Sequence, residues 1–197
     1  RALWQLLFSG KFDKFPGLKY CVVECGSWWV GDLLWKADVN FGASWKIKKM
    51  SSRMKGLLTK LPSEYFGDSV FIGASTMSRY EIRERHRNGI DALMWGTDYP
   101  HPEGSWPNTV HRLENDFQDV SIEDTRRLLG LNAIECYDLD VEGLTTVANR
   151  IGPTPEKLNQ DPALRTSPTA KRDARWWFDE YGICLLYTSD AADEIAS

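Results

Sequence analysis

Three short apolar runs stand out along the chain, at residues 20–24, 69–72 and 92–95. None of them alternates regularly between apolar and polar positions, and a glycine follows each run closely. Continuous apolar runs of this length are typical of strands that are buried on both faces of a parallel sheet. We therefore predict three central strands, with Gly73 ending the second of them.

The segments between and after these runs carry apolar residues at helical spacing. A helix is predicted after Ser27, whose side chain could cap it. A polar helix is predicted to begin at Ser78, because Ser78 and Glu81 have the spacing of a capping box. Further helices are predicted after Pro107 and after Ser121.

Strands that alternate with helices predict an α/β fold with a parallel sheet and right-handed crossovers. Three strands cannot close a barrel, and a complete (β/α)8 TIM barrel takes about 250 residues. We therefore interpret residues 1–150 as the C-terminal portion of such a barrel. Because Arg1 opens directly onto a helical pattern, we expect further protein to precede it.

The character of the sequence changes after Asp140. Prolines recur among polar residues, so residues 151–183 are predicted to form an extended C-terminal tail. Its aromatic cluster at residues 176–178 could pack onto the domain or onto a partner. Residues 184–197 resemble the translated read-through of a sequencing adapter, and we expect them to be an artefact; a short native C-terminal helix is the alternative.

Composition narrows the class of protein. The apolar fraction of 42% and the charged fraction of 26% are ordinary for a soluble globular protein. The net charge of -4 argues against nucleic acid as a partner. No apolar stretch approaches the ~18 residues of a membrane span, so no membrane partner is expected. The cysteines fit no metal-finger spacing and predict reduced thiols in a cytoplasmic protein, although a signal peptide ahead of Arg1 stays an open alternative.

The residues that follow the third run carry the most chemistry. Asp98 comes directly after a buried strand, and Tyr99 and Pro100 continue into a rigid loop with His101 and Glu103. Barrel enzymes present metal ligands and proton carriers at the C-terminal ends of their strands. Asp98 is therefore interpreted as a site residue, the alternative being a carboxylate that caps the loop or the next helix. His101 could contact substrate or shuttle a proton, or it could simply bond to backbone. Glu103 is interpreted as a solvated or loop-stabilising carboxylate.

Three short motifs resemble the amidohydrolase superfamily. The similarity is greatest to the amidohydrolase-related branch that includes the aminocarboxymuconate semialdehyde decarboxylase-like enzymes, and it covers residues 1–152. The motifs are Trp95-Gly96-Thr97-Asp98-Tyr99-Pro100-His101, Phe15-Pro16-Gly17-Leu18-Lys19 ahead of the first strand, and Leu131-Asn132-Ala133.

The resemblance implies a barrel with a divalent metal, often zinc, at the C-terminal ends of the strands. It makes the three predicted strands the sixth, seventh and eighth, and it makes Asp98 the metal-associated aspartate. The family's histidine ligands on the first and fifth strands would lie before Arg1. Decarboxylase-type members commonly carry a histidine at the end of the sixth strand, whereas this chain has Glu24 there. Glu24 could accept protons, bind metal or orient a cation; alternatively it is a buried carboxylate that needs a partner.

The resemblance and these residues together predict a metal-dependent hydrolase that directs activated water at a C–N or C–O bond. Asp98 would assist the metal and deprotonate the water, with Glu24 and His101 as secondary site residues. A non-oxidative decarboxylase is the first alternative, and a barrel that binds without catalysis is the second. Ser75 and Thr76 could line the same pocket or cap a helix.

The expected partners are a small-molecule substrate and, as in many members of the family, a second copy of the chain. The basic stretch at residues 46–60 is most simply a solvated surface, and the alternative is that it attracts an anionic substrate. Because half a barrel leaves sheet edges unpaired, we expect this piece alone to be inactive and to be poorly soluble or oligomeric.

Overall fold

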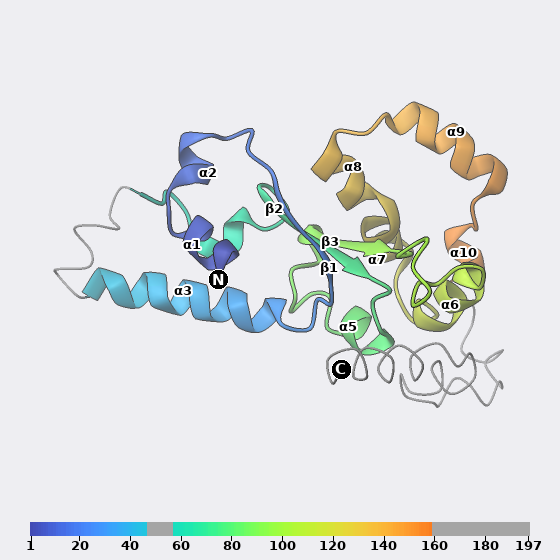
Figure 1. Cartoon of the computed structure of the whole chain (residues 1–197), viewed down its shortest axis with the longest axis horizontal. Coiled ribbons are helices and arrows are strands. Elements are labelled where there is room, and N and C mark those ends of the chain that lie inside the picture. Colours follow the sequence, from blue (N-terminus) through green and yellow to red (C-terminus); the bar gives the residue numbers. More distant parts are fainter. Residues whose placement is uncertain (47–56, 159–197) are drawn as a thin grey trace, which may run out of the picture.

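A computed structural model describes residues 1–46 and 57–158. Its centre is a parallel sheet of three strands in the order β1-β2-β3, formed by Tyr20–Cys25, Val70–Ser75 and Leu93–Gly96 (Figure 1). Tyr20 pairs with Val70 at one end of the sheet, and Ser75 pairs with Gly96 at the other. The predicted α/β architecture with a parallel sheet is confirmed, and it is consistent with part of a TIM barrel.

The second strand is longer than predicted, because Gly73 lies inside it rather than at its end. Gly73 pairs with Val23 on one side and with Met94 on the other. A side chain at this position would meet Val23 Cγ1 at 3.1 Å. This glycine therefore marks a close approach between strands and not a turn.

Helices follow each strand, as the alternating pattern predicted. α3 (Val30–Lys46) follows β1, and the short α5 (Arg79–Arg83) follows β2. The first helical segments after β3 are α6 (Thr109–Asp116), α7 (Ile122–Arg126), the π-helical turn η3 (Arg127–Leu131) and α8 (Asn132–Tyr137). The remaining elements are α1 (Ala2–Leu7), α2 (Lys11–Lys14), η1 (Pro62–Tyr65), η2 (Ile90–Ala92), α9 (Val141–Ile151) and α10 (Pro155–Leu158).

The N-termini of two helices test the capping predictions. Ser78 caps α5 as predicted, and the Glu81 side chain accepts from its backbone N–H at 2.9 Å. Ser27 does not cap α3 with its side chain. Its backbone N–H and its hydroxyl both donate to Glu81 Oε1, so this buried serine joins the loop after β1 to the start of α5.

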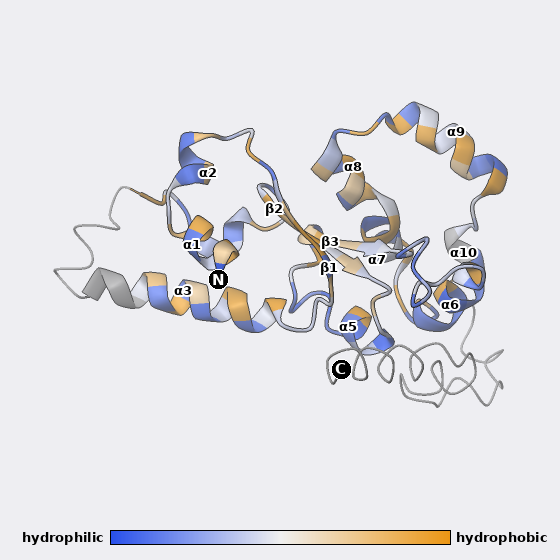
Figure 2. Cartoon of the chain, in the orientation of Figure 1, coloured by the Kyte–Doolittle hydropathy of each residue, from blue (hydrophilic) through white to orange (hydrophobic). Residues whose placement is uncertain are grey.

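The core lies on both faces of the sheet, whose strands are strongly apolar (Figure 2). On one face, Ile72 of β2 and Leu93 of β3 pack under the helices together with Ile82, Phe117 and Leu128. The opposite face is smaller and brings together Phe71, Met94 and Cys136, with Cys21 and Ala133 beside them. This alternation fixes which side chains can point toward a site at the carboxyl edge of the sheet.

Asn132 ties α8 to the beginning of β3. Its buried side-chain amide donates to the carbonyls of Ile90 and Leu93, both at 2.7 Å, and its Oδ1 accepts from Arg127. One asparagine thus bonds both to the turn η2 ahead of β3 and to the first residue of β3. This contact gives a physical reason for the Leu131-Asn132-Ala133 motif.

Several predictions concern the C-terminal region and the basic stretch. The predicted tail begins with a helical segment, because α10 forms at its start and Leu158 is buried in the core. The aromatic cluster at 176–178 and the segment 184–197 lie outside the described residues, as does most of the basic stretch. Lys60, at the end of that stretch, forms an ion pair of 2.8 Å with Asp68. Among the helices that the structure describes, none has the length and apolar character needed to span a membrane.

Candidate metal centre

Asp98 lies two residues beyond the end of β3, on the carboxyl edge of the sheet. Its backbone is in the left-handed region, with φ of 60°. Residues other than glycine are uncommon in this conformation, which aspartate tolerates better than most, and strained backbone of this kind clusters at functional sites. The Asp98 side chain is 15% exposed, so it is largely enclosed but open to a small ligand.

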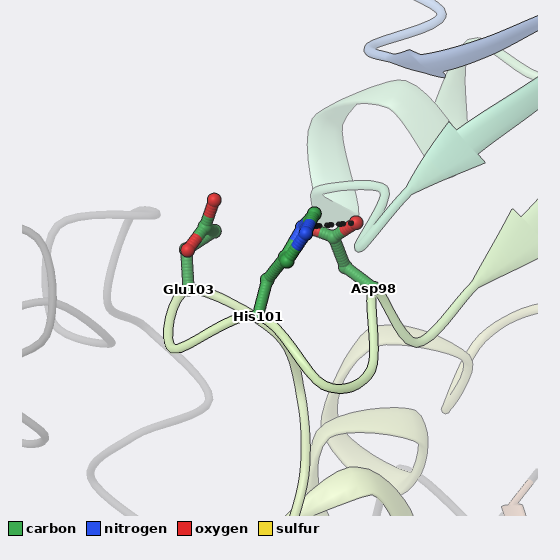
Figure 3. A group of neighbouring side chains, drawn as sticks. All are labelled: Asp98, His101 and Glu103. Carbon is green, nitrogen blue, oxygen red and sulfur yellow. Dashed lines mark ion pairs between the residues drawn. The ribbon is translucent and has the colours of Figure 1, made fainter.

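One oxygen of the Asp98 carboxylate carries its contacts. The hydroxyl of Ser75, the last residue of β2, donates to Asp98 Oδ1 at 3.3 Å. His101 Nδ1 lies 3.5 Å from the same oxygen (Figure 3). Within the described ranges 1–46 and 57–158, no hydrogen bond or ion pair engages Oδ2. The carboxylate therefore keeps one oxygen available for a cation or a proton.

The loop that carries Asp98 is held by its own backbone. The His101 N–H donates to the Asp98 carbonyl at 2.8 Å, and the Gly104 N–H donates to the His101 carbonyl at 3.0 Å. The Ser105 N–H closes the loop by donating to the Thr97 carbonyl at 2.8 Å. Consecutive turns of this kind bring the side chains at positions 98, 101 and 103 together on one side of the loop.

Asp98, His101 and Glu103 form a group that could hold a metal ion. One ligand atom from each of the three lies within 4.8 Å of the others (Figure 3). One imidazole and two carboxylates are ligands that zinc and other divalent transition metals accept. The donor set therefore fits a divalent cation. His101 is 51% exposed and Glu103 is also exposed, so both reach toward solvent while Asp98 lies beneath them.

Glu103 is the member of this group that the sequence did not single out. It was interpreted as a solvated carboxylate, and its exposure agrees with that, but its position beside His101 makes it a candidate ligand. The spacing of Asp98, His101 and Glu103 within six residues was the available signal. It becomes informative only once the turns of the loop are known.

Glu24 lies at the carboxyl end of β1 and is separated from Asp98 by the intervening strand β2. It is the extra residue of a β-bulge, because Val23 pairs with Gly73 and Cys25 pairs with Ala74. Its φ is 54°, and the residue is exposed. Glu24 is thus not buried within the described residues, where β1 is an edge strand of the sheet. Glu24 is not a member of the Asp98 group.

Comparison with known proteins identifies the family. The model of the amidohydrolase family matches residues 1–139, which contain the whole sheet and the Asp98 loop. The chain belongs to the amidohydrolase family. Members of this family generally depend on a metal, in keeping with the donor set around Asp98. A search of curated proteins found no match.

Solved structures support the same amidohydrolase fold. The 5-carboxyvanillate decarboxylase LigW from Sphingomonas paucimobilis is 24% identical with a TM-score of 0.51, over 70% of this chain and 38% of its own. The amidohydrolase map2389c from Mycobacterium avium subsp. paratuberculosis is 22% identical with a TM-score of 0.50, over 68% of this chain and 32% of its own. The chain thus spans about a third of the length of these relatives.

Proposed function

We propose that this chain is the C-terminal part of a metal-dependent hydrolase of the amidohydrolase family, acting on a C–N or C–O bond of a small molecule. In this proposal β1, β2 and β3 are the sixth, seventh and eighth strands of the barrel. The observation that carries the proposal is the position of Asp98, a largely enclosed carboxylate just beyond β3 with donor atoms of His101 and Glu103 beside it.

The proposed metal is zinc, held by Asp98 together with ligands from strands outside this chain, and with His101 or Glu103 as further donors. When bound, such a metal supplies Lewis acidity and activates water for attack near neutral pH. The role of the protein is to hold the Asp98 carboxylate in one orientation. Ser75 and His101 contact its Oδ1, so Oδ2 would be the oxygen able to accept a proton.

Where Glu103 and not His101 completes the metal site, His101 is proposed as a second proton carrier. It is half exposed and lies 3.5 Å from Asp98 Oδ1, so a proton on the carboxylate could pass to the imidazole and on to solvent. Glu24 is proposed as a residue of the site's rim. Its place at the carboxyl end of β1 and its exposure would let it contact a substrate that reaches across the sheet edge.

Non-oxidative decarboxylation is the second candidate. The structural similarity to LigW, a 5-carboxyvanillate decarboxylase, supports this candidate. Glu24 favours hydrolysis, because a carboxylate there would repel the substrate carboxylate that a decarboxylase must bind. The two reactions differ in their products. Labelled oxygen from water in the organic product supports hydrolysis, whereas release of carbon dioxide with no label in the organic product supports decarboxylation.

The proposal is tested with Asp98→Asn in the full-length protein, which retains the size and shape of the side chain but cannot accept a proton in the same way. We expect turnover to fall by at least about a hundred-fold, because a general base contributes that much or more. Asp124→Asn is the matched control, since the Asp124 side chain is also 15% exposed and pairs with Arg85 and His86 instead of the Asp98 group. Full activity in Asp98→Asn would refute the assignment.

A further inference from the structure

A second pair of charged residues lies close to the carboxyl edge of the sheet, on α6. Arg112 Nε is 3.1 Å from Asp116 Oδ2, and the two side chains are only 12% and 8% exposed. Asn115 donates to the other Asp116 oxygen at 2.9 Å. Burial raises the pKa of Asp116, and Arg112 counteracts this by favouring the charged form. Because an enclosed ion pair contributes little net stability, the pairing with Asp116 does not by itself explain why this guanidinium is enclosed.

Arg112 also reaches from α6 to the end of β2. Its Nη2 donates to the carbonyl oxygen of Thr76 at 2.8 Å. Thr76 has a φ of 45°, a conformation that a β-branched residue rarely adopts. The Thr76 N–H donates to the carbonyl of Gly96 at 2.8 Å, so both polar backbone groups of this strained residue are engaged.

This strained residue lies between Arg112 and the candidate metal centre. Ser75 directly precedes Thr76, and the Ser75 hydroxyl donates to Asp98 Oδ1. The backbone conformation of Thr76 sets the direction in which the chain leaves β2, directly after Ser75. The Thr76 N–H bond to Gly96 joins the same turn to the strand that carries Asp98.

We propose that Arg112 is a positioning residue for Asp98: by holding the Thr76 carbonyl, it fixes the turn that places the Ser75 hydroxyl on the Asp98 carboxylate. The inference rests on the proposed function, because it takes Asp98 as the residue whose orientation matters. Asp116 takes part in the same arrangement, since it orients the Arg112 guanidinium. A donor that fixes a ligand's orientation typically changes metal affinity or activity by about 10- to 100-fold when removed.

The chain offers a close control in Arg85. Its Nε lies 2.7 Å from Asp124 Oδ2, its Nη1 donates to the Ile82 carbonyl at 3.1 Å, and both side chains of the pair are 15% exposed. Arg85 therefore makes the same kinds of contact as Arg112 with similar burial. Its carbonyl partner, however, lies in α5 and not at the end of a strand beside Asp98.

The experiment is a double-mutant cycle in the full-length protein, with Arg112→Gln, Ser75→Ala and the combined variant. Zinc affinity is measured by competition with a chromophoric chelator, and kcat and KM are measured separately. We expect each single variant to lose about ten-fold in zinc affinity and in kcat. The combined variant should lose little more than either alone, because both act on Asp98 through one connection.

Arg85→Gln should retain zinc affinity and kcat, even if its thermal stability falls as much as that of Arg112→Gln. Arg112→Lys, which keeps a donor for Thr76 and is the safeguard if Arg112→Gln fails to fold, should recover part of the loss. The inference is overturned, and the proposed function is left standing, in either of two cases. In the first, the fold-losses in zinc affinity and kcat of the two single variants multiply in the combined variant. In the second, Arg85→Gln loses as much as Arg112→Gln. A fully active Asp98→Asn measured in parallel would instead overturn the proposed function and this inference with it.

Discussion

Gly104→Ala tests whether the geometry of the Asp98 loop is as tightly fixed as its hydrogen bonds indicate. Gly104 is buried, and a β-carbon there would lie 2.9 Å from three carbonyl oxygens, those of Thr97, Asp98 and His101. These carbonyls accept the backbone hydrogen bonds that close the loop. Backbone atoms cannot rotate away as the end of a flexible side chain can, so the added methyl group must displace the loop.

The expected cost follows from those contacts. Overpacking a filled site costs about 1–3 kcal/mol, and each hydrogen bond that the displacement weakens is worth about 1 kcal/mol. Because three carbonyls are affected at once, we expect the free energy of unfolding to fall by about 2–3 kcal/mol. Zinc affinity should fall as well, because Asp98 and His101 move with the loop.

The assay compares Gly104→Ala with Gly17→Ala in the full-length protein, by urea denaturation and by zinc titration. Gly17 is a matched control, because no atom lies within 4 Å of the position that its β-carbon would occupy. The control should leave both quantities unchanged or slightly raise stability. If Gly104→Ala has the stability and the zinc affinity of the wild type, the argument that this loop is sterically fixed is wrong.

Three further predictions concern the scaffold. Asn132→Asp replaces the buried amide donor to Ile90 and Leu93 with a carboxylate, so the free energy of unfolding in urea should fall by about 3 kcal/mol or more; a loss under about 1 kcal/mol would contradict this. Burial, followed by the hydrogen bond to a neighbouring carboxylate, raises the pKa of Tyr65 to about 12. The stability that the un-ionised Tyr65 contributes is therefore complete below pH 10 and is lost as the pH rises to 12. The free energy of unfolding should accordingly fall less steeply with pH across that window in Tyr65→Phe than in the wild type. Burial raises the pKa of Cys136 to about 11, so at pH 8 a thiol reagent should modify it far more slowly than in urea, and equal rates would count against its burial.

The sequence predicted the strands well because their apolar runs have few other interpretations. The runs at 20–24 and 92–95 correspond to β1 and β3 within about a residue or two at each end, which is the ordinary uncertainty of element boundaries. Gly73 was misinterpreted because a glycine that ends a strand and a glycine that permits close approach between strands have the same local sequence. Only the pairing with Val23 distinguishes them.

The candidate site was predictable only in part. Asp98 follows from its place after a buried run, whereas the sequence leaves Ser75 as either a pocket residue or a helix cap, and only the structure shows its contact with Asp98. The bulge at Glu24 has no signature in the sequence, because it depends on the register against β2. The contact between Arg112 and the Thr76 carbonyl joins residues 36 positions apart, so no local pattern reveals it.

The most direct test of the central claim is the zinc affinity of the full-length protein with Asp98 intact and with Asp98→Asn. The account predicts about one tightly bound zinc ion per chain in the wild type. It predicts that Asp98→Asn binds zinc at least about ten-fold more weakly while its thermal stability without metal is unchanged. Equal zinc affinity in the two proteins would contradict the claim that Asp98 is a ligand of the metal.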